Sequence, residues 1–144
     1  MMKFAVARGN VRIAYDVLGT GAPVALLHDF GETSGSWYET GCVKACLARD
    51  RQVVLVDLRG HGDSGEPVDA TAYAPIHCGW DVIAVLDHAG IGRADILGYG
   101  VGDGLRSASR LSHPIGCMLS RPGRPIPLPN ALSAGARPMA WSPG

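Results

Sequence analysis

Short apolar runs alternate with amphipathic stretches over most of the chain, and glycine or proline separates them. Residues 11–17 alternate apolar and polar side chains, and we expect them to pair with residues 3–7 across a turn at Arg8-Gly9-Asn10. Residues 23–27 and 52–57 are apolar without alternation, which is typical of strands covered by helices on both faces. These runs predict an N-terminal hairpin followed by buried strands.

Two amphipathic stretches among these runs predict helices. Residues 36–49 carry apolar side chains at helical spacing and predict a crossover helix, which would make the flanking strands a parallel pair. Residues 77–89 repeat the pattern, and Asp81, Asp87 and His88 are expected to face solvent.

A last strand and helix complete the regular part of the sequence. Residues 94–98 form another apolar run, and residues 101–112 predict a helix that stops at His113-Pro114. We find no internal repeat at a period of about 20–50 residues. The fold class predicted by this alternation is α/β, with a mostly parallel, doubly wound sheet behind the N-terminal hairpin.

Charge and proline content change together near residue 104. Residues 1–103 hold all 13 acidic residues and 8 of the 13 basic ones, whereas residues 104–144 hold five arginines and no acid. Seven of the ten prolines fall in the last 31 residues, and proline is excluded from helix interiors and central strands. We therefore expect one domain over residues 1–114 and a Pro/Arg-rich irregular or disordered tail over residues 115–144, with at best a damaged strand at 115–119.

Composition excludes several classes of function. Thirteen basic and thirteen acidic residues give no net charge, which argues against nucleic-acid binding. No apolar run approaches the roughly 20 residues that cross a membrane, and the N-terminus lacks a secretory signal, so we expect a cytoplasmic protein. The four cysteines match no zinc-binding spacing and are expected to be reduced thiols, and neither a metal nor a cofactor is expected.

Five motifs follow one another along the chain at characteristic spacing. They are Gly19 to Gly21, Leu26-Leu27-His28-Asp29-Phe30-Gly31, Trp37, the run from Val56 to Ser64, and Leu97-Gly98-Tyr99-Gly100-Val101-Gly102. In content and spacing they resemble the N-terminal half of the α/β-hydrolase family, over about residues 3–114. The most specific of them is the Asp-x-Arg-Gly-His-Gly-x-Ser run at residues 57–64.

The resemblance implies an oxyanion-binding loop at residues 28–31. His28 and Gly31 would shape this loop, and the backbone N–H of Phe30 would be one of the two oxyanion donors. Asp29 stands where the family usually has glycine, so it either tightens the turn or places a negative charge beside the oxyanion. A plain strand-to-helix loop is the alternative interpretation.

Residues 57–64 are interpreted as architecture. Glycine permits unusual backbone angles, and short polar side chains can fix a loop by hydrogen bonds. We therefore assign His61 a structural position in the loop and no role as a general base. The residues expected to shape this loop are Asp57, Arg59, Gly60, Gly62 and Ser64.

The turn at residues 98–102 corresponds to the family's nucleophile elbow, Gly-x-Ser-x-Gly, in which Gly98 and Gly102 allow close packing. The nucleophile position is Gly100 here, so neither a serine acyl-enzyme nor an aspartate alkyl-enzyme can form at it. The N–H of Val101 is the expected second oxyanion donor. As a dinucleotide-binding loop the pattern fails, because Asp103 occupies the position of the third glycine.

The family takes its acid and its histidine base from positions well beyond the elbow. No acidic residue follows Asp103 in this sequence, and His113 lies about 20 Å from the elbow along the predicted helix. Asp103, Ser107 and Ser109 are interpreted as ordinary helix positions, because a carboxylate is favoured in a first turn. The chain is thus expected to be truncated after the elbow helix.

The expected function follows from these departures. The chain is predicted to be an α/β-hydrolase-family protein, descended from enzymes that hydrolyse esters or related small molecules, with a degenerate and impaired or inactive site. The alternative is a pseudoenzyme or non-catalytic protein that binds a small ligand or a partner. Because a shortened sheet leaves an open edge, self-association through that edge is also expected.

Overall fold

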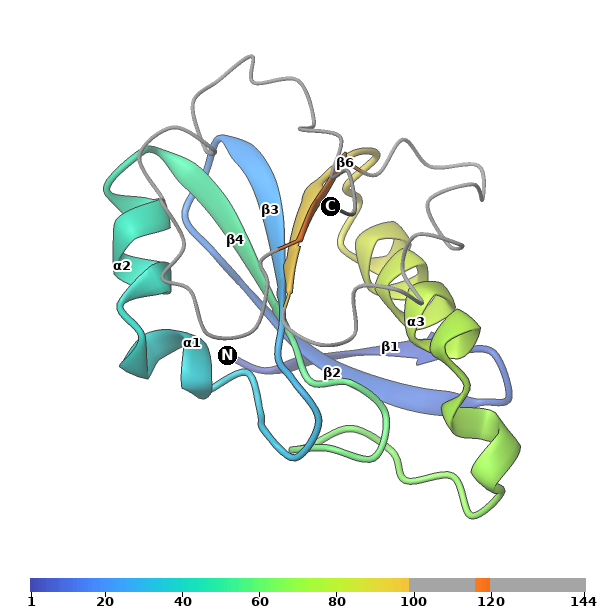
Figure 1. Ribbon diagram of the computed structural model, residues 1–144. Helices are drawn as coiled ribbons and strands as arrows, with labels where there is room; N and C mark the ends of the chain where they lie inside the picture. Colours follow the sequence, from blue (N-terminus) through green and yellow to red (C-terminus); the bar gives the residue numbers. More distant parts are fainter. Residues whose placement is uncertain (99–115, 120–144) are drawn as a thin grey trace, which may run out of the picture.

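Six strands in the described part of the chain form one sheet, in the order β1-β2-β4-β3-β5-β6 (Figure 1). The computed structural model describes residues 1–98 and the backbone of residues 116–119, and residues 99–115 and 120–144 lie outside this description. The sheet mixes an antiparallel hairpin at one side with parallel strands over the rest.

The hairpin consists of β1 (Lys3–Ala7) and β2 (Val11–Leu18), paired antiparallel with Ala7 opposite Val11. Gly9 and Asn10 take positive φ angles of 78° and 59° in the turn, a conformation that these two residue types adopt most readily. Strand β2 also pairs antiparallel with β4, so the hairpin extends the main sheet. The predicted hairpin is confirmed.

The centre of the sheet is a parallel pair, β3 (Ala22–Leu27) and β4 (Arg51–Val56). Their apolar side chains are buried on both faces, as the absence of alternation predicted. Strand β5 (Asp95–Gly98) pairs parallel with β3.

Strand β6 (Gly116–Leu119) pairs parallel with β5, with Gly98 opposite Leu119. It lies within the segment expected to be irregular from residue 115 onward, at the place where a damaged strand was expected. Regular structure therefore extends past residue 114. The helix predicted at 101–112 and the remainder of the expected tail lie outside the described residues.

The crossover between β3 and β4 contains two short helices, α1 (Ser36–Glu39) and α2 (Cys42–Leu47). The single helix predicted over residues 36–49 is therefore wrong. Gly41 has a φ of 76°, which is left-handed backbone and cannot continue a right-handed helix.

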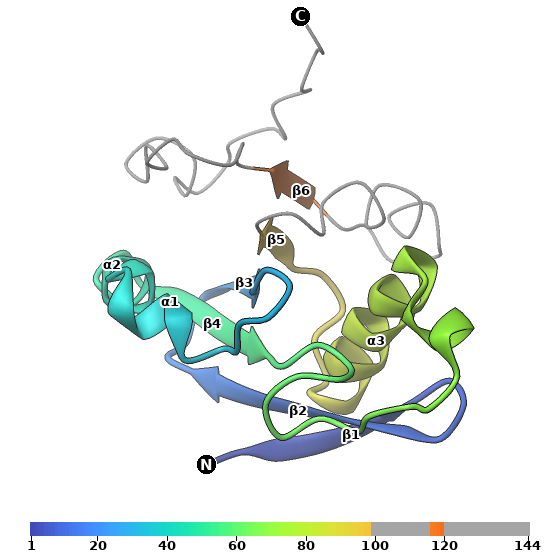
Figure 2. The ribbon, with the colours of Figure 1, turned by 60° about the horizontal axis from the view of Figure 1, so that its bottom comes forward.

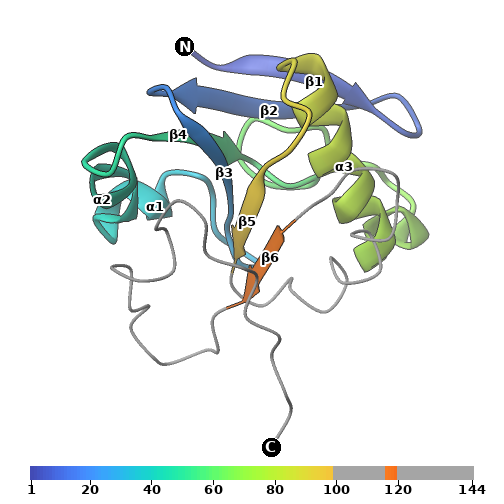
Figure 3. The same ribbon diagram turned by 90° about the horizontal axis from the view of Figure 1, so that it is seen from above.

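Helices cover both faces of the sheet, as Figures 2 and 3 show. Helices α1 and α2 pack Trp37, Val43 and Cys46 on one face. A 3-10 turn, η1 (Ala70–Tyr73), leads into α3 (Pro75–His88), which packs Val82 and Leu86 on the other face. The doubly wound α/β class is confirmed.

Helix α3 is fixed to the hairpin by polar and cationic contacts as well. The Arg8 guanidinium carbon lies 3.5 Å from the centroid of a Trp80 ring, in a cation–π contact. The Tyr15 hydroxyl and His88 Nδ1 are 2.7 Å apart. Burial raises the pKa of the Tyr15 phenol.

Arg51 joins the amino ends of three parallel strands. It begins β4, and its Nε donates to the carbonyl of Ala22 at 2.8 Å while Nη2 donates to that of Pro23 at 3.3 Å, both in β3. Nη2 also lies 2.5 Å from a carboxylate oxygen of Asp95, the first residue of β5. The Arg51 side chain is 5% exposed.

Cys42, Cys46 and Cys78 are free thiols, as the cysteine spacing predicted. The side chain of Cys117 lies outside the described residues. Among the residues that the structure describes, no helix has the length and apolar character needed to cross a bilayer.

Candidate active site at the carboxyl end of the sheet

Three parallel strands end at the same edge of the sheet. Strands β4, β3 and β5 are parallel neighbours, and their last residues Val56, Leu27 and Gly98 lie in register. The loops that follow β4 and β3 therefore start close to each other and to Gly98, at the lower end of the sheet in Figure 1. This is the edge at which parallel α/β sheets generally bind their ligands.

Gly98 allows the strands β3 and β5 to approach closely. A Cβ atom at this position would lie 3.3 Å from the carbonyl oxygen of Leu27 and 3.4 Å from its Cβ. Gly98 is buried, so a side chain there would require Leu27 to move by a few tenths of an ångström.

His28 follows β3 and is completely buried. Its Nε2 accepts a hydrogen bond from the N–H of Leu58 at 3.0 Å, so Nδ1 carries the proton and donates to the carbonyl of Asp29 at 2.8 Å. Burial lowers the pKa of His28, which favours this neutral form. His28 therefore joins two loops and has no nitrogen left to accept a proton from a substrate.

Residues 29–32 form a tight turn in which three consecutive N–H groups have acceptors inside the protein. The N–H of Phe30 donates to Oδ1 of Asp29 at 2.8 Å. The N–H of Gly31 donates to Nε2 of His61 at 3.0 Å, and the N–H of Glu32 donates to the carbonyl of Asp29 at 3.1 Å. Gly31 has a φ of 81°, the value needed at the third position of a type II turn.

His61 connects this turn to the loop after β4. Its Nε2 accepts from Gly31, so its Nδ1 carries the proton and donates to the carbonyl of Arg59 at 3.0 Å. The ring centroid lies 5.0 Å from that of His28 and 5.2 Å from that of Phe30, whose ring is perpendicular and 78% exposed. The arrangement makes His61 a structural link and leaves Phe30 facing solvent.

Asp57 holds the loop after β4 against the loop after β3. Its Oδ1 accepts from the N–H of Ser34 at 2.8 Å and its Oδ2 from that of Asp63 at 3.1 Å, and its side chain is buried. The backbone of Gly62 lies against this carboxylate and has a φ of 51°. A Cβ atom at Gly62 would collide with the Asp57 side chain.

Ser64 ties the same loop to the hairpin. Its hydroxyl donates to the carbonyl of Asp57 at 2.5 Å and accepts from the N–H of Ala14 at 2.8 Å. Ser64 is 6% exposed, so both backbone groups are shielded from water. The hydroxyl therefore satisfies two groups that would otherwise be buried without partners.

Arg59 forms a buried bidentate ion pair with Asp81 of α3. Nε and Nη2 donate to the two carboxylate oxygens at 2.7 and 2.6 Å, and Nη1 donates to the carbonyl of Ala72 at 2.7 Å. These hydrogen bonds to Asp81 raise the pKa of Arg59. The prediction that Asp81 faces solvent is wrong, because it is fully buried, whereas Asp87 and His88 are exposed.

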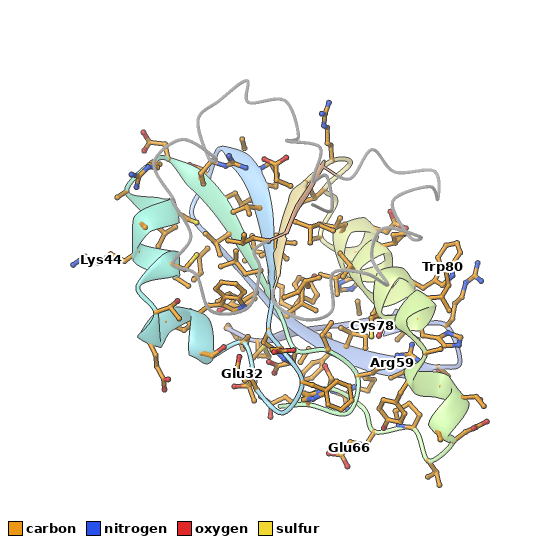
Figure 4. The ribbon with its side chains drawn as sticks, viewed as in Figure 1. Glu32, Lys44, Arg59, Glu66, Cys78 and Trp80 are labelled. Atoms are coloured by element: carbon orange, nitrogen blue, oxygen red, sulfur yellow. The ribbon has the colours of Figure 1, made fainter. Side chains whose placement is uncertain are left out.

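Figure 4 shows Arg59 beside α3 and Glu32 on the loop after β3, at the same end of the sheet. Gly60, next to Arg59, has a φ of 77°, and a Cβ there would lie 2.6 Å from Cε1 of Tyr73. Positive φ and close approach thus account for the glycine at this position.

Several predicted site residues lie outside the described residues. They are the nucleophile position Gly100, the second donor Val101, and Gly102, together with Asp103, Ser107, Ser109 and His113. The structure therefore brings together His28, the 29–32 turn and residues 57–64, and it describes the start of the elbow only at Gly98.

Comparison with known proteins agrees with this architecture. The family model described as alpha/beta hydrolase fold matches residues 22–102, and the chain belongs to this family. An epoxide hydrolase from Caballeronia sordidicola is 29% identical over 97 residues, which cover 67% of this chain and 29% of that protein. A 2-hydroxymuconate semialdehyde hydrolase from Pseudomonas sp. strain CF600 is 32% identical over 98 residues, covering 67% of this chain and 34% of that enzyme.

A solved structure gives the same result for the fold. The bottromycin epimerase BotH in complex with bottromycin A2 aligns with a TM-score of 0.75 and 26% identity, over 82% of this chain and 47% of that one. The chain spans less than half the length of each of these relatives. The family resemblance carried by the motifs is confirmed.

Proposed function

We propose that this chain descends from hydrolases of esters or related small molecules and that it has no nucleophile-dependent hydrolase activity. One observation carries the proposal, namely the register of β3 and β5, in which Leu27 is opposite Gly98. This register places Gly98, the first residue of the elbow motif, beside the strand end from which the oxyanion-type loop starts. The position two residues beyond Gly98 is Gly100, and glycine supplies no hydroxyl, thiol or carboxylate.

The two histidines of the loops after β3 and β4 support the same proposal. A general base needs a free nitrogen lone pair within reach of the proton that it removes. His28 Nε2 and His61 Nε2 each accept a backbone N–H, and their Nδ1 atoms each donate to a carbonyl. Neither ring can therefore act as a general base without breaking a contact that shapes the site.

A second candidate function is the binding of a small ligand or partner without hydrolysis. The similarity to bottromycin epimerase supports it, since that protein is an epimerase bound to bottromycin A2 and shares the fold at 26% identity. A mutated elbow is compatible with binding, because binding needs neither a nucleophile nor a base. A cytoplasmic location and association through a sheet edge belong to the same proposal.

The test compares the chain with its Gly100→Ser variant. Both are treated with a fluorophosphonate, which labels activated serines, and with 4-nitrophenyl acetate. Gly92→Ser is the matched control, because residue 92 precedes β5 and has open space around it. We expect no labelling and no turnover above buffer from the parent chain or from Gly92→Ser.

The outcomes separate the explanations. Ester turnover by the parent chain contradicts the proposal. Labelling of the Gly100→Ser variant alone identifies the missing hydroxyl as the main defect. If neither protein is labelled or hydrolyses the ester, a hydroxyl at position 100 is not sufficient for the reaction.

A further inference from the structure

The turn at residues 29–32 differs chemically from a working oxyanion-binding loop. Such a loop stabilises negative charge with backbone N–H groups that point at the developing oxyanion and have no other acceptor. In this chain the N–H groups of Phe30, Gly31 and Glu32 all donate to acceptors within the protein. The acceptor at Phe30 is itself a carboxylate, Asp29 Oδ1 at 2.8 Å.

We propose that Asp29 is a specificity-determining residue, whose carboxylate occupies the Phe30 donor and excludes anions from this loop. The inference rests on the proposed function, because it takes residues 28–31 to be the loop that would face a reacting carbonyl. Asp29 would then be a second feature, independent of Gly100, that opposes hydrolysis. It would also decide which chemical class of ligand the loop accepts. The loop accepts neutral or cationic groups and rejects carboxylates, phosphonates and oxyanions.

Geometry keeps the Asp29 carboxylate in this place. The Asp29 carbonyl accepts from both His28 Nδ1 and the N–H of Glu32, so the backbone from which the side chain extends is fixed at two points. Aspartate at the first position of a turn commonly bonds a nearby backbone N–H, and the contact orders few rotatable bonds. An incoming anion must therefore displace an acceptor that is already in position.

Charge acts in the same direction as the hydrogen bond. Two anions that compete for one N–H group repel each other at hydrogen-bonding separation. The nearest buried imidazole, His28, is neutral in this tautomer and does not offset the carboxylate. Blocking of the donor and repulsion together account for the exclusion.

The experiment measures anion binding and not turnover. Ethylphosphonate is titrated into ¹⁵N-labelled protein at neutral pH, and the amide signal of Phe30 is followed by NMR. We expect no saturable shift in the parent chain. The Asp29→Gly variant is expected to bind ethylphosphonate at least about tenfold more tightly than the parent chain does. The reason is that the Phe30 N–H no longer donates to a carboxylate.

Two further variants separate the causes. Asp29→Asn keeps an acceptor oxygen for the Phe30 N–H and removes the charge, so we expect binding between those of the parent and Asp29→Gly. Glu32→Gln removes one negative charge from the same exposed turn and leaves the N–H of residue 32 bonded to Asp29, so it should behave as the parent. Equal affinities in the parent and Asp29→Gly, whether strong or absent, overturn the inference.

A second measurement needs no variant and covers the case in which Asp29→Gly misfolds. The Phe30 amide donates to Asp29, so its hydrogen should exchange with solvent more slowly than that of an exposed amide without an acceptor. A Phe30 amide that exchanges as fast as such a group overturns the inference. Gly100 is retained throughout, so ester turnover by the parent contradicts the proposed function alone, while phosphonate binding by the parent contradicts this inference alone.

Discussion

The N–H of Leu58 donates to Nε2 of His28 at 3.0 Å. This hydrogen bond joins the His28 side chain, which follows β3, to the backbone of the loop after β4. Both residues are buried, so water cannot replace either partner. The bond requires His28 to be neutral, because a protonated ring has no acceptor nitrogen. Stability should therefore depend on pH through this residue.

Replacing His28 by glutamine tests this dependence. Burial lowers the pKa of His28 from 6.5, so below about pH 6.5 the unfolded chain binds a proton that the folded chain resists. The parent loses this contribution as pH falls, by up to about 1.4 kcal/mol per pH unit. We expect the stability difference between the parent and His28→Gln, from urea unfolding at pH 7.5 and 5.5, to shrink at the lower pH. A difference that stays constant contradicts the assignment.

The glycine over Asp57 gives a second prediction. Gly62→Ala combines a positive φ with a collision against the carboxylate, whereas Gly41→Ala has the same backbone handedness and open space around it. Gly41→Ala should cost about 1–2 kcal/mol for the left-handed backbone alone. Gly62→Ala should cost more, since the carboxylate must also leave Ser34 and Asp63. Chemical denaturation measures both, and equal losses would show that the contact is relieved without cost.

The ion pair between Arg59 and Asp81 gives a third prediction. Asp81→Asn leaves a buried guanidinium without its counter-charge, and such losses are typically about 3–5 kcal/mol. Replacing both residues, as Arg59→Met with Asp81→Leu, should cost less than the sum of the single changes, because no charge remains unpaired. A double-mutant cycle by urea unfolding measures the difference.

A matched ion pair serves as the control for that cycle. Asp95→Asn removes a carboxylate that is 38% exposed, so solvent replaces much of its interaction with Arg51. Its loss should be clearly smaller than that of Asp81→Asn. Additive effects at Arg59 and Asp81 would argue against a coupled pair.

Ser64 gives a fourth prediction. Ser64→Ala removes the acceptor of the Ala14 N–H and the donor to the Asp57 carbonyl, at a site that is 6% exposed. Leaving buried polar groups unpaired typically costs about 1–3 kcal/mol. Faster amide exchange at Ala14 should accompany the loss. Ser36→Ala, which removes a hydroxyl bond to the Thr33 carbonyl at an exposed site, should change stability by less than about 0.5 kcal/mol.

Local patterns predicted most of the elements and failed where a single backbone angle decided. The hairpin and α3 follow from periodicity and turn residues, which short segments carry within themselves. The break in the helix at Gly41 does not follow from periodicity, because a single glycine is tolerated inside a helical pattern. The amino-acid sequence does not show that Gly41 has a φ of 76°.

The helical pattern predicts an exposed Asp81, because acidic residues in amphipathic helices usually face solvent, whereas the residue is buried. A signal was present, since Asp81 precedes the buried Val85 by one helical turn and so shares its face. Its partner Arg59 lies 22 residues away, a contact that spacing alone does not indicate.

The Asp29 contact marks the limit of sequence reasoning at the site. The sequence shows an acid in the loop and predicts either a tighter turn or a negative charge beside the oxyanion. Which backbone group the carboxylate binds depends on its rotamer. Only the structure gives Phe30 as the partner.

Arg51 connects the strands at one end of the sheet, and the loops of the candidate site lie at the other end. One side chain connects the first residues of three parallel strands, at the end opposite the 28–32 and 57–64 loops. These contacts hold the strand registers from the end opposite the loops. The domain is therefore suited to use as a scaffold for display, in which randomised loops replace residues 29–32 while His28, Arg51 and their partners stay unchanged.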